Sequence, residues 1–533
     1  MALQTRFLPL LSLMIFFIPT CYGGTITGTV KGTEGAPFQG AFVEAQNMKS
    51  RITVMVLSDS HGRYRFEKLP PGEYRLQIRA IGFRAEPQTE ISLIADANAS
   101  YDFSLQKGMV RWSDISFYQA KQLWPAAKGK DLIVAHCSTC HLVQTRMASV
   151  TRDEDGWRDR VEFMRTAMHF SLSKITDQDA DEIASYLAKL FGPDSVLPKS
   201  PEAMPGYKDT VRPFSSDAMN VVYVEYEMPG PSRMPFSAAP DKDGYLWIPN
   251  FGVANKITRL DPKTGEMQDF SVPNVGTAAI HSAVPGPDGS VWLAEQAANK
   301  LGRWDPSTQK ITEYQDAYLP GKEGLEGGGN KHTVRLDPSG NVWASGSPLT
   351  KFDPETRKFT RFDDVPGVYD VKPDKNGDVW FTLAGVNKIG KVDGKTMKVS
   401  EWTVPTEKSF PRRLEIAPDG GIWTGEFNAG KMARFDPTTQ SFKEYTLPGP
   451  DPSPYSLGFD ANGYLWYDSH HMDVLGRFDT KTGKVVEYPV PHSEIAMREF
   501  FCDSQGRMWY GTNPNNKVGY FYLTPVGAES ASK

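Results

Sequence analysis

The amino-acid sequence predicts a multidomain, mainly β protein that contains a small β-sandwich, an all-α domain and a seven-bladed β-propeller. Short β-type segments separated by tight turns fill residues 25–106, and apolar residues at helical spacing follow in residues 110–195. A Gly-x-apolar-Trp unit then recurs seven times within residues 215–525. A chain of 533 residues is too long for one hydrophobic core. We therefore expect three folded domains after a leader of residues 1–24.

The leader has the pattern of a secretory signal peptide. Arg6 precedes an apolar run from Phe7 to Ile18, and small residues follow. This run is too short to span a bilayer, and no other stretch reaches the ~18 apolar residues that a transmembrane helix needs. We expect a periplasmic or secreted protein with no transmembrane anchor after signal removal. A lipoprotein attached through Cys21 is the alternative, although the residues before Cys21 match a lipoprotein signal poorly.

Charge and cysteine content limit the classes of binding partner and of covalent cross-link that the chain can have. The net charge of −5 gives no reason to expect nucleic acid as a partner. Of the four cysteines, Cys21 lies in the leader and two lie in one short motif, so Cys502 stands alone. A disulfide framework within one chain is therefore excluded.

Residues 25–106 have the strand and turn pattern of a small antiparallel sandwich. Alternating β-formers in Thr25–Val30 and Tyr74–Ile78 lie on either side of turns such as Leu69-Pro-Pro-Gly72. The segment resembles the carboxypeptidase regulatory-like domain in its G-x-V start, its D-x-x-G-x-Y/F-x-F strand and its L-P-P-G-x-Y turn. The resemblance implies an accessory module without catalytic residues.

The stretch Cys137-Ser-Thr-Cys140-His141 carries the clearest chemistry. Two thiols at this spacing, followed directly by a histidine, are typical of c-type haem attachment. Cys137 and Cys140 would bind the haem vinyl groups, and His141 would be the proximal iron ligand. A thioredoxin-like redox pair would need a βαβ context, and a zinc site would need a second ligand pair. Neither is visible, so we predict one covalent haem c.

Helical patterns surround this motif. We expect helices over residues 128–143, 155–168 and 177–190, with Thr176 as the N-cap of the last. The segment resembles a small class I cytochrome c, in which the last helix packs on the N-terminal one. The expected fold of residues 110–195 is therefore an all-α cytochrome c domain.

The sixth iron ligand is open between several residues. Met164 follows Trp157 by seven positions, which resembles the W-x6-M pattern of related small cytochromes. Met168 is the alternative one turn later, and His169 or an open site completes the choices. A thioether ligand would close the last coordination position and favour an electron carrier.

The seven repeats predict a propeller. Their tryptophans lie 37 to 51 residues apart, a spacing that suits blades of four short strands. The segment Val221–Tyr226 precedes the first repeat and matches the outer strand that the last repeat lacks. We expect it to complete the last blade and leave no free sheet edge. The tryptophans are Trp247, Trp292, Trp343, Trp380, Trp423, Trp466 and Trp509.

The repeats share the pattern D-G-x-apolar-W-x-x-E followed by N-K-I-G-R, in part, and so resemble the streptogramin B lyase (virginiamycin B lyase) family of seven-bladed propellers. The WD dipeptide and the TGxxxW pattern do not recur, so WD40 and quinoprotein propellers fit less well.

Candidate site residues stand eleven positions before each tryptophan, where the innermost strand of a blade begins near the axis. Four of the seven are histidine or arginine, which favours a site at one mouth of the propeller. The seven are Phe236, His281, His332, Tyr369, Arg412, Tyr455 and Arg498.

The resemblance assigns roles to some of these positions. The lyases carry catalytic histidines in consecutive blades, which implies His281 and His332. They also carry an acidic residue and a glutamate where this chain has Asn330 and Gly346, so the implied magnesium site is incomplete. Glu295 occupies the glutamate position of another blade. We expect Glu295 to point into the axial cavity together with Arg412 and Arg498. A divalent metal such as magnesium at this mouth is one possible cofactor.

Two functional classes follow. In the first, an exported haem-dependent oxidoreductase passes electrons between haem c, a small-molecule substrate on the propeller and a redox partner protein. In the second, the propeller is a carbon–oxygen lyase or a ligand binder, and the cytochrome is a separate module. Haem is superfluous to an eliminase, so the sequence favours the first class. A structural surface protein is a third interpretation, suggested only by the accessory sandwich.

Overall fold

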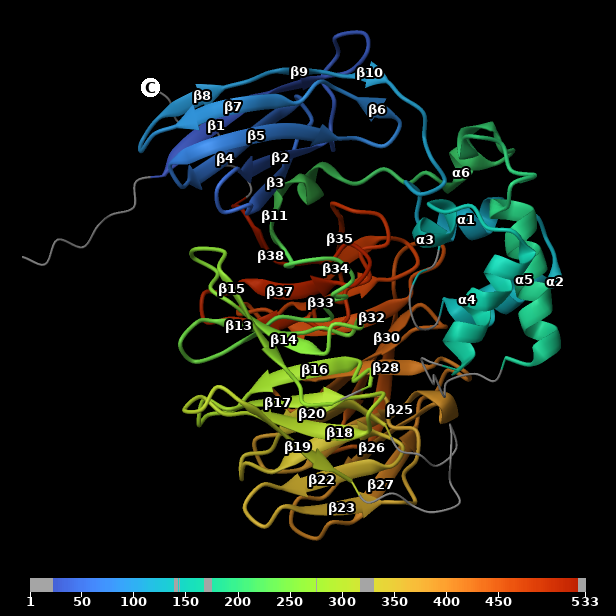
Figure 1. Ribbon diagram of the computed structural model, residues 1–533, viewed down its shortest axis with the longest axis vertical. Helices are drawn as coiled ribbons and strands as arrows, with labels where there is room; N and C mark the ends of the chain where they lie inside the picture. The colour runs from blue at the N-terminus through green and yellow to red at the C-terminus, as the bar shows by residue number, and fades with distance from the viewer. Residues whose placement is uncertain are drawn as a thin grey trace, which may run out of the picture.

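The computed structural model describes residues 23–138, 142, 144–166, 175–274, 276–316 and 330–525. The β-sandwich lies at one end of the molecule, and the helices lie along one side of the propeller (Figure 1). The predicted leader lies outside the described residues, except for its last two positions. No helix in the described part of the chain is long and apolar enough to cross a membrane.

The first part is the predicted sandwich of two sheets. One sheet has the order β4-β1-β8, with β9 also on β1, and in the other β3, β2, β5 and β7 are neighbours. In β4, Tyr64 and Phe66 are buried and alternate with exposed arginines, as expected for a strand with one face on a core. The strands are β1 (Gly24–Lys31), β2 (Phe42–Asn47), β3 (Thr53–Leu57), β4 (Arg63–Leu69), β5 (Gly72–Arg79), β6 (Phe83–Arg84), β7 (Gln88–Leu93), β8 (Asn98–Ser100), β9 (Phe103–Ser104) and β10 (Gln106–Lys107).

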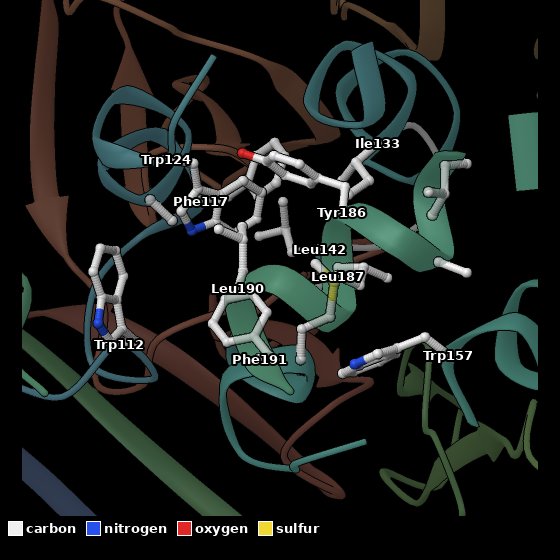
Figure 2. Close-up of a cluster of buried hydrophobic side chains, with 14 of the residues drawn as sticks. Trp112, Phe117, Trp124, Ile133, Leu142, Trp157, Tyr186, Leu187, Leu190 and Phe191 are labelled. Atoms are coloured by element: carbon white, nitrogen blue, oxygen red, sulfur yellow. The ribbon is translucent and has the colours of Figure 1, made fainter. Parts of the chain in front are cut away.

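The second part is helical and has its own core. Figure 2 shows aromatic side chains of this core gathered around Leu187 and Leu190. Thr176 and Asp179 form a capping box at the start of α5, so the predicted N-cap is confirmed. The elements are α1 (Phe117–Leu123), α2 (Lys128–Leu132), the π-helical turn η1 (Ile133–Cys137), α3 (Gln144–Ala148), α4 (Glu154–Thr166) and α5 (Asp177–Phe191).

Two features of the helical part differ from expectation. The helix expected over residues 128–143 narrows to α2 and then changes to the π-helical turn, which ends at Cys137. Helix α1 was not expected, although Ser116 and Gln119 form a capping box that the sequence displays. Helices α2 and α5 pack closely, because a side chain on Gly129 would lie 2.4 Å from Cβ of Tyr186.

The third part is a propeller of seven four-stranded blades within the described residues. Six blades are separate sheets, and the seventh has the order β36-β37-β38-β11. Strand β11 is the outer strand of the last blade, which confirms the predicted closure. The short helices η2 (Pro201–Ala203), α6 (Tyr207–Thr210) and η3 (Ser216–Asn220) lead into it, and η4 (Ala384–Val386) lies in the fourth blade.

The strands of the first four blades are β12 (Ala239–Pro240), β13 (Leu246–Pro249), β14 (Lys256–Leu260), β15 (Met267–Ser271), β16 (Ile280–Pro285), β17 (Val291–Glu295), β18 (Lys300–Trp304), β19 (Ile311–Gln315), β20 (Lys331–Leu336), β21 (Val342–Gly346), β22 (Leu349–Asp353), β23 (Lys358–Phe362), β24 (Val371–Pro373), β25 (Val379–Leu383), β26 (Lys388–Val392) and β27 (Val399–Thr403). The remaining blades use β28 (Pro411–Ile416), β29 (Ile422–Glu426), β30 (Lys431–Asp436), β31 (Ser441–Thr446), β32 (Pro454–Phe459), β33 (Leu465–Ser469), β34 (Val474–Phe478), β35 (Val485–Pro489), β36 (Phe501–Cys502), β37 (Met508–Thr512), β38 (Lys517–Leu523) and β11 (Val221–Glu227).

A recurring hydrogen bond explains the spacing of the repeat motif. The indole Nε1 of Trp247 donates to Asp241 at 2.9 Å, and Trp509 donates to Asp503 at 2.7 Å in the last blade. The turn between each pair contains a glycine with positive φ, such as Gly244 at 87°. The same bond joins Trp343 to Asp337 and Trp466 to Asp460, so in these four blades the Asp, Gly and Trp fix one hairpin.

The sandwich and the propeller share a sheet. The free edge of β11 pairs with β3 in antiparallel register, Val224 opposite Val54 and Tyr223 opposite Met55. Blade seven thereby continues into the sandwich as one eight-stranded sheet. The pairing covers the outer edge of the closing strand, which would otherwise expose unpaired backbone groups.

Candidate functional site at the propeller axis

The seven residues that stand eleven positions before the blade tryptophans form a closed ring, which we call the axial ring. Each side chain contacts the next, and the guanidinium of Arg498 returns to within 5.2 Å of the Phe236 ring centroid. All seven are at most 5% exposed. The structure thus brings together His281, His332, Arg412 and Arg498 as the sequence placed them.

Bulges in the innermost strands aim these side chains at the axis. The register of β16 against β17 shifts between Ile280 and Ser282, which leaves His281 as the extra residue. Corresponding shifts surround His332, Arg412 and Tyr455 in their own blades. A bulge re-aims a side chain at the cost of local pairing, and such features often lie next to functional sites.

The two histidine rings lie close together, with their planes inclined by 34°. Their ring centroids are 3.7 Å apart, with Phe236 at 4.8 Å from one ring and Tyr369 at 4.6 Å from the other. Burial, followed by His332 and nearby arginines, holds the pKa of His281 well below its usual range. Burial and then Arg413 do the same to the pKa of His332. Both imidazoles are therefore neutral in neutral solution.

Each histidine keeps one unused nitrogen. Among the described residues, neither Nδ1 of His281 nor Nε2 of His332 has a hydrogen-bond partner. Nδ1 of His332 hydrogen-bonds the hydroxyl of Thr333 at 3.1 Å. A buried nitrogen without a partner carries a free-energy penalty that a bound ligand can remove.

The opposite half of the ring alternates arginines and phenols. Nη1 of Arg412 donates to Oη of Tyr369 at 3.2 Å, and Nη1 of Arg498 donates to Oη of Tyr455 at 2.6 Å. The two phenol oxygens hydrogen-bond each other. The guanidinium of Arg412 also lies 4.2 Å from the ring centroid of Phe427, a cation–π distance.

A second layer, one residue further along the innermost strands, holds this ring in place. Arg413 pairs with Asp370 at 3.0 Å and with Glu499 at 2.9 Å, and it donates to Thr333 at 2.8 Å. All four side chains are buried. These contacts tie four blades together directly beneath the axial ring.

Glu295 does not contact the axial ring among the described residues. Glu295 packs against Gly302 of the neighbouring strand, because its Oε1 would lie 2.7 Å from a Cβ atom added to that glycine. Burial, and next the nearby carboxylate of Glu313, raise the pKa of Glu295 to about 8. Lys300 pairs with Glu313 at 2.7 Å. Glu295 therefore belongs to the interior of its own blade, contrary to our expectation that it points into an axial cavity.

The fifth blade repeats this arrangement. Glu426 lies at the position of Glu295, and burial and then Glu444 raise the pKa of Glu426 to about 7. Lys431 pairs with Glu444 at 3.0 Å. A motif that recurs in a blade remote from the histidines is a property of the repeat and not of one site.

The residues in place of the related lyases' acidic pair do not suit magnesium. Gly346 has φ of 143°, and a side chain there would lie 1.9 Å from the backbone oxygen of Asn330. Glutamate cannot replace glycine without backbone movement. In the described part of the chain, no three His, Cys, Asp or Glu side chains are grouped to hold a metal ion. The residues present at the mouth do not fit the expected divalent metal.

The helical part docks beside the axial ring through α3. The backbone N–H of Thr145 donates to Glu494 at 3.1 Å, and Nη2 of Arg146 donates to Asn513 at 2.8 Å. Burial, partly offset by Glu494 and reinforced by Arg498, lowers the pKa of Arg146. Arg146, five residues after His141 of the Cys-x-x-Cys-His motif, is therefore close enough to interact electrostatically with Arg498 of the axial ring.

Helix α1 makes a second contact at the same mouth. The N–H of Tyr118 donates to the backbone oxygen of His471 at 2.7 Å, and Lys121 pairs with Asp451 at 2.6 Å. His470 directly precedes His471, and its ring stacks on the ring of Tyr455 with the two centroids 4.9 Å apart. Sequence reasoning missed both docking contacts, because no periodic motif marks them.

The predicted haem ligands are only partly within the described residues. Cys137 ends the π-helical turn and packs against the helical core. The other candidates, Cys140, His141, Met168 and His169, lie outside the described residues. Met164 is 36% exposed and absent from that core.

The helical core also contains a buried donor that suits haem. Trp157 is 4% exposed, and among the described residues its indole Nε1 has no hydrogen-bond partner. An apolar cluster with a thiol at its surface and an unused buried donor fits a haem that carries polar side groups.

Comparisons with known proteins agree with the two β parts. Residues 355–527 match the model of the Virginiamycin B lyase family, and residues 25–106 match that of the Carboxypeptidase regulatory-like domain. Neither match includes residues 110–195. No curated protein matches the sequence.

Two solved structures share the propeller. A streptogramin B lyase is 23% identical with a TM-score of 0.52, and the match covers 58% of this chain and 100% of the lyase. A selenomethionine-substituted virginiamycin B lyase from Staphylococcus aureus is 21% identical with a TM-score of 0.51, over 57% of this chain and 100% of the other. At this identity the likeness shows the propeller fold alone.

Proposed function

We propose that the axial ring binds a small organic acid and that His281 and His332 exchange a proton with it in a lyase-like reaction. The observation that carries this proposal is the close pair of buried, neutral histidines, each with an unused nitrogen. The likeness to streptogramin lyases in fold supports the same reaction class.

The charge around the histidines favours an anion. Arg413 and Arg498 lower the pKa of both imidazoles through space, and Arg335 and Arg412 act on one each. Arg413 and Arg335 are paired with carboxylates, so the positive charge near the histidine pair comes chiefly from Arg412 and Arg498 of the axial ring. This positive charge attracts and holds a carboxylate in a site from which water is largely excluded.

The same groups suit an elimination. A neutral imidazole takes a proton from the carbon next to the carboxyl or carbonyl group, and the arginines stabilise the negative charge that develops. The electron pair of the broken C–H bond forms a carbon–carbon double bond and expels an oxygen. That oxygen then takes the proton from the imidazolium, so atoms and charge balance without a metal ion.

The experiment begins with native mass spectrometry of the purified protein to identify a bound acid. We expect that the His281→Ala and His332→Ala variants lose binding and at least about 100-fold of turnover, the usual scale for general acid–base groups. His61→Ala is the matched control, because His61 lies in an exposed turn of the sandwich.

Two results would contradict this proposal. One is unchanged binding in both histidine variants. The other is magnesium-dependent ring opening of a type B streptogramin, because the residues at Asn330 and Gly346 do not fit that metal.

A second candidate function is electron transfer through haem c, supported by the Cys137-x-x-Cys140-His141 motif and the docking of α3 beside the axial ring. Cys137 and Cys140 would attach the haem, His141 would ligate its iron, and Met164 or Met168 would be the distal ligand. When bound, haem c supplies a one-electron carrier. This candidate requires export, which the leader pattern supports, and a redox partner protein.

The haem assignment is tested by replacing both cysteines. Cys137→Ser with Cys140→Ser should abolish haem that survives denaturation, measured by haem-stained gels and the reduced c-type spectrum. Cys502→Ser is the matched control and should keep the full haem signal. Covalent haem that persists in the double variant would remove this candidate.

A further inference from the structure

The two phenols of the axial ring lie on either side of Arg412, and Arg498 follows Tyr455 in the ring. We propose that Tyr369 and Tyr455 together carry one proton instead of two, so that the ring holds a phenolate in neutral solution. This inference deepens the proposed function by naming a second proton-accepting group at the same site. Its test needs no ligand, so it can fail separately from the proposed function.

The hydrogen-bond count carries the argument. Arg412 donates to Tyr369 and Arg498 donates to Tyr455, and each phenol also hydrogen-bonds the other. Among the described residues, neither oxygen has a further hydrogen-bond partner. Two neutral phenols bring two protons, but the bond between them uses only one. The second proton has no acceptor among the described residues, and its removal leaves no phenol O–H without a partner.

The surrounding charges point the same way. Arg412 and Arg413 face the pair from β28, and Arg498 faces it from the segment before β36. The guanidinium carbons of Arg412 and Arg498 lie 4.5 Å and 4.8 Å from the ring centroid of Tyr455. Two nearby carboxylates, Asp370 and Glu499, pair with Arg413.

The histidines around the pair add no competing negative charge. His332 contacts Tyr369 from β20, and His470 stacks on Tyr455 from the end of β33. Asp468 hydrogen-bonds His470 at 3.1 Å, and burial raises the pKa of Asp468 to about 7. Asp468 is therefore only partly ionised in neutral solution, whereas the oxygen of Tyr455 lies in direct hydrogen-bond contact with Arg498.

The two phenols are not equivalent. Burial works to raise the pKa of Tyr455, but Arg498, Arg412 and Arg413 outweigh it and bring that pKa below its ordinary value. Burial and then Tyr455 raise the pKa of Tyr369. The shared proton therefore stays on Tyr369, and the charge rests on Tyr455.

The phenolate has a consequence for the histidines. The His332 ring lies 4.6 Å from the ring of Tyr369. When His332 takes a proton, the negative pair beside it stabilises the imidazolium, and the pair can itself accept that proton. The site then stores one proton without any change in the backbone.

The experiment is carbon NMR of the full-length protein, labelled at tyrosine Cζ and kept under reductant. A phenolate carbon resonates apart from a phenol carbon, so one of the 21 tyrosines should give a phenolate signal in neutral buffer. We expect Tyr455→Phe to abolish it and Arg498→Gln to shift its titration toward the ordinary phenol pKa of about 10. Tyr245→Phe is the matched control, because Tyr245 is 36% exposed.

The outcomes separate clearly. Circular dichroism confirms that the variants fold before the spectra are compared. A phenolate signal lost only in Tyr455→Phe supports the inference. If every tyrosine stays a phenol up to about pH 9, or if the signal survives Tyr455→Phe, the pair holds two protons and the inference is wrong.

Discussion

At the scale of single residues, one position in each repeat decides which side chains meet at the propeller axis. The spacing from each tryptophan located His281, His332, Arg412 and Arg498 correctly, because every blade repeats the same strand geometry. The same reasoning misplaced Glu295. It stands at a motif position, but its side chain turns toward Glu313 inside the blade. Position along a strand is readable from sequence, whereas the direction of a side chain depends on packing between strands.

The raised pKa of Glu295 leads to a stability prediction. Folding favours protonated Glu295, so its contribution is complete below about pH 4.5 and declines as pH rises to about 8. Glu295→Gln keeps the shape without the charge and should stabilise the protein at pH 8 by about 1–3 kcal/mol. Urea unfolding across pH measures this. Exposed Glu266→Gln should show no such change, and equal pH profiles for Glu295→Gln and the wild type would contradict the prediction.

At the scale of elements, periodic signals predicted most of the fold. Tryptophan spacing gave the blades, and the capping residues at Thr176 gave the start of α5. The strand β11 was predicted as the closing strand, but its pairing with β3 was not. Edge pairing uses backbone groups, which every sequence possesses, so side-chain patterns do not reveal it. The break of the expected helix into α2 and a π-helical turn likewise has no residue signature.

The contact between α2 and α5 supports an element-scale prediction. A side chain at Gly129 would lie 2.4 Å from Cβ of Tyr186 and 2.7 Å from the backbone oxygen of Glu182. Gly129→Ala should therefore destabilise the helical part by about 1–3 kcal/mol, the usual cost of overpacking. Thermal unfolding followed by circular dichroism measures the loss. Gly385→Ala meets no atom within 4 Å and should leave the transition unchanged. Equal effects of the two changes would show that the helices do not pack as described.

At the scale of the whole molecule, the three parts are joined at defined places. The sandwich shares a sheet with the seventh blade, and the helical part docks on the propeller through α1 and α3. The docking places the segment after the Cys-x-x-Cys-His motif against Glu494 and Asn513 of the propeller, which the sequence did not indicate. Contacts between domains join residues hundreds of positions apart, and a single sequence without repeats at those sites carries no signal for them.

The docking of α3 yields the last prediction. Arg146 is the side chain of α3 that reaches Asn513, and Glu494 beside it accepts from the backbone of Thr145. Arg146→Ala removes the side-chain contact, so α3 should separate from blade seven more often. Hydrogen exchange with mass spectrometry should then show amide exchange in residues 144–148 and 492–498 several-fold faster, while blades two and three stay unchanged.

Arg160→Ala is the matched control for this docking, because Arg160 is an exposed arginine of α4 in the same helical part. It removes one positive charge at a comparable place without touching the propeller. If both arginine changes speed exchange equally, the effect reflects loosening of the helical part in general. If neither does, α3 is held by backbone contacts alone, and Arg146 does not fasten α3 to the propeller.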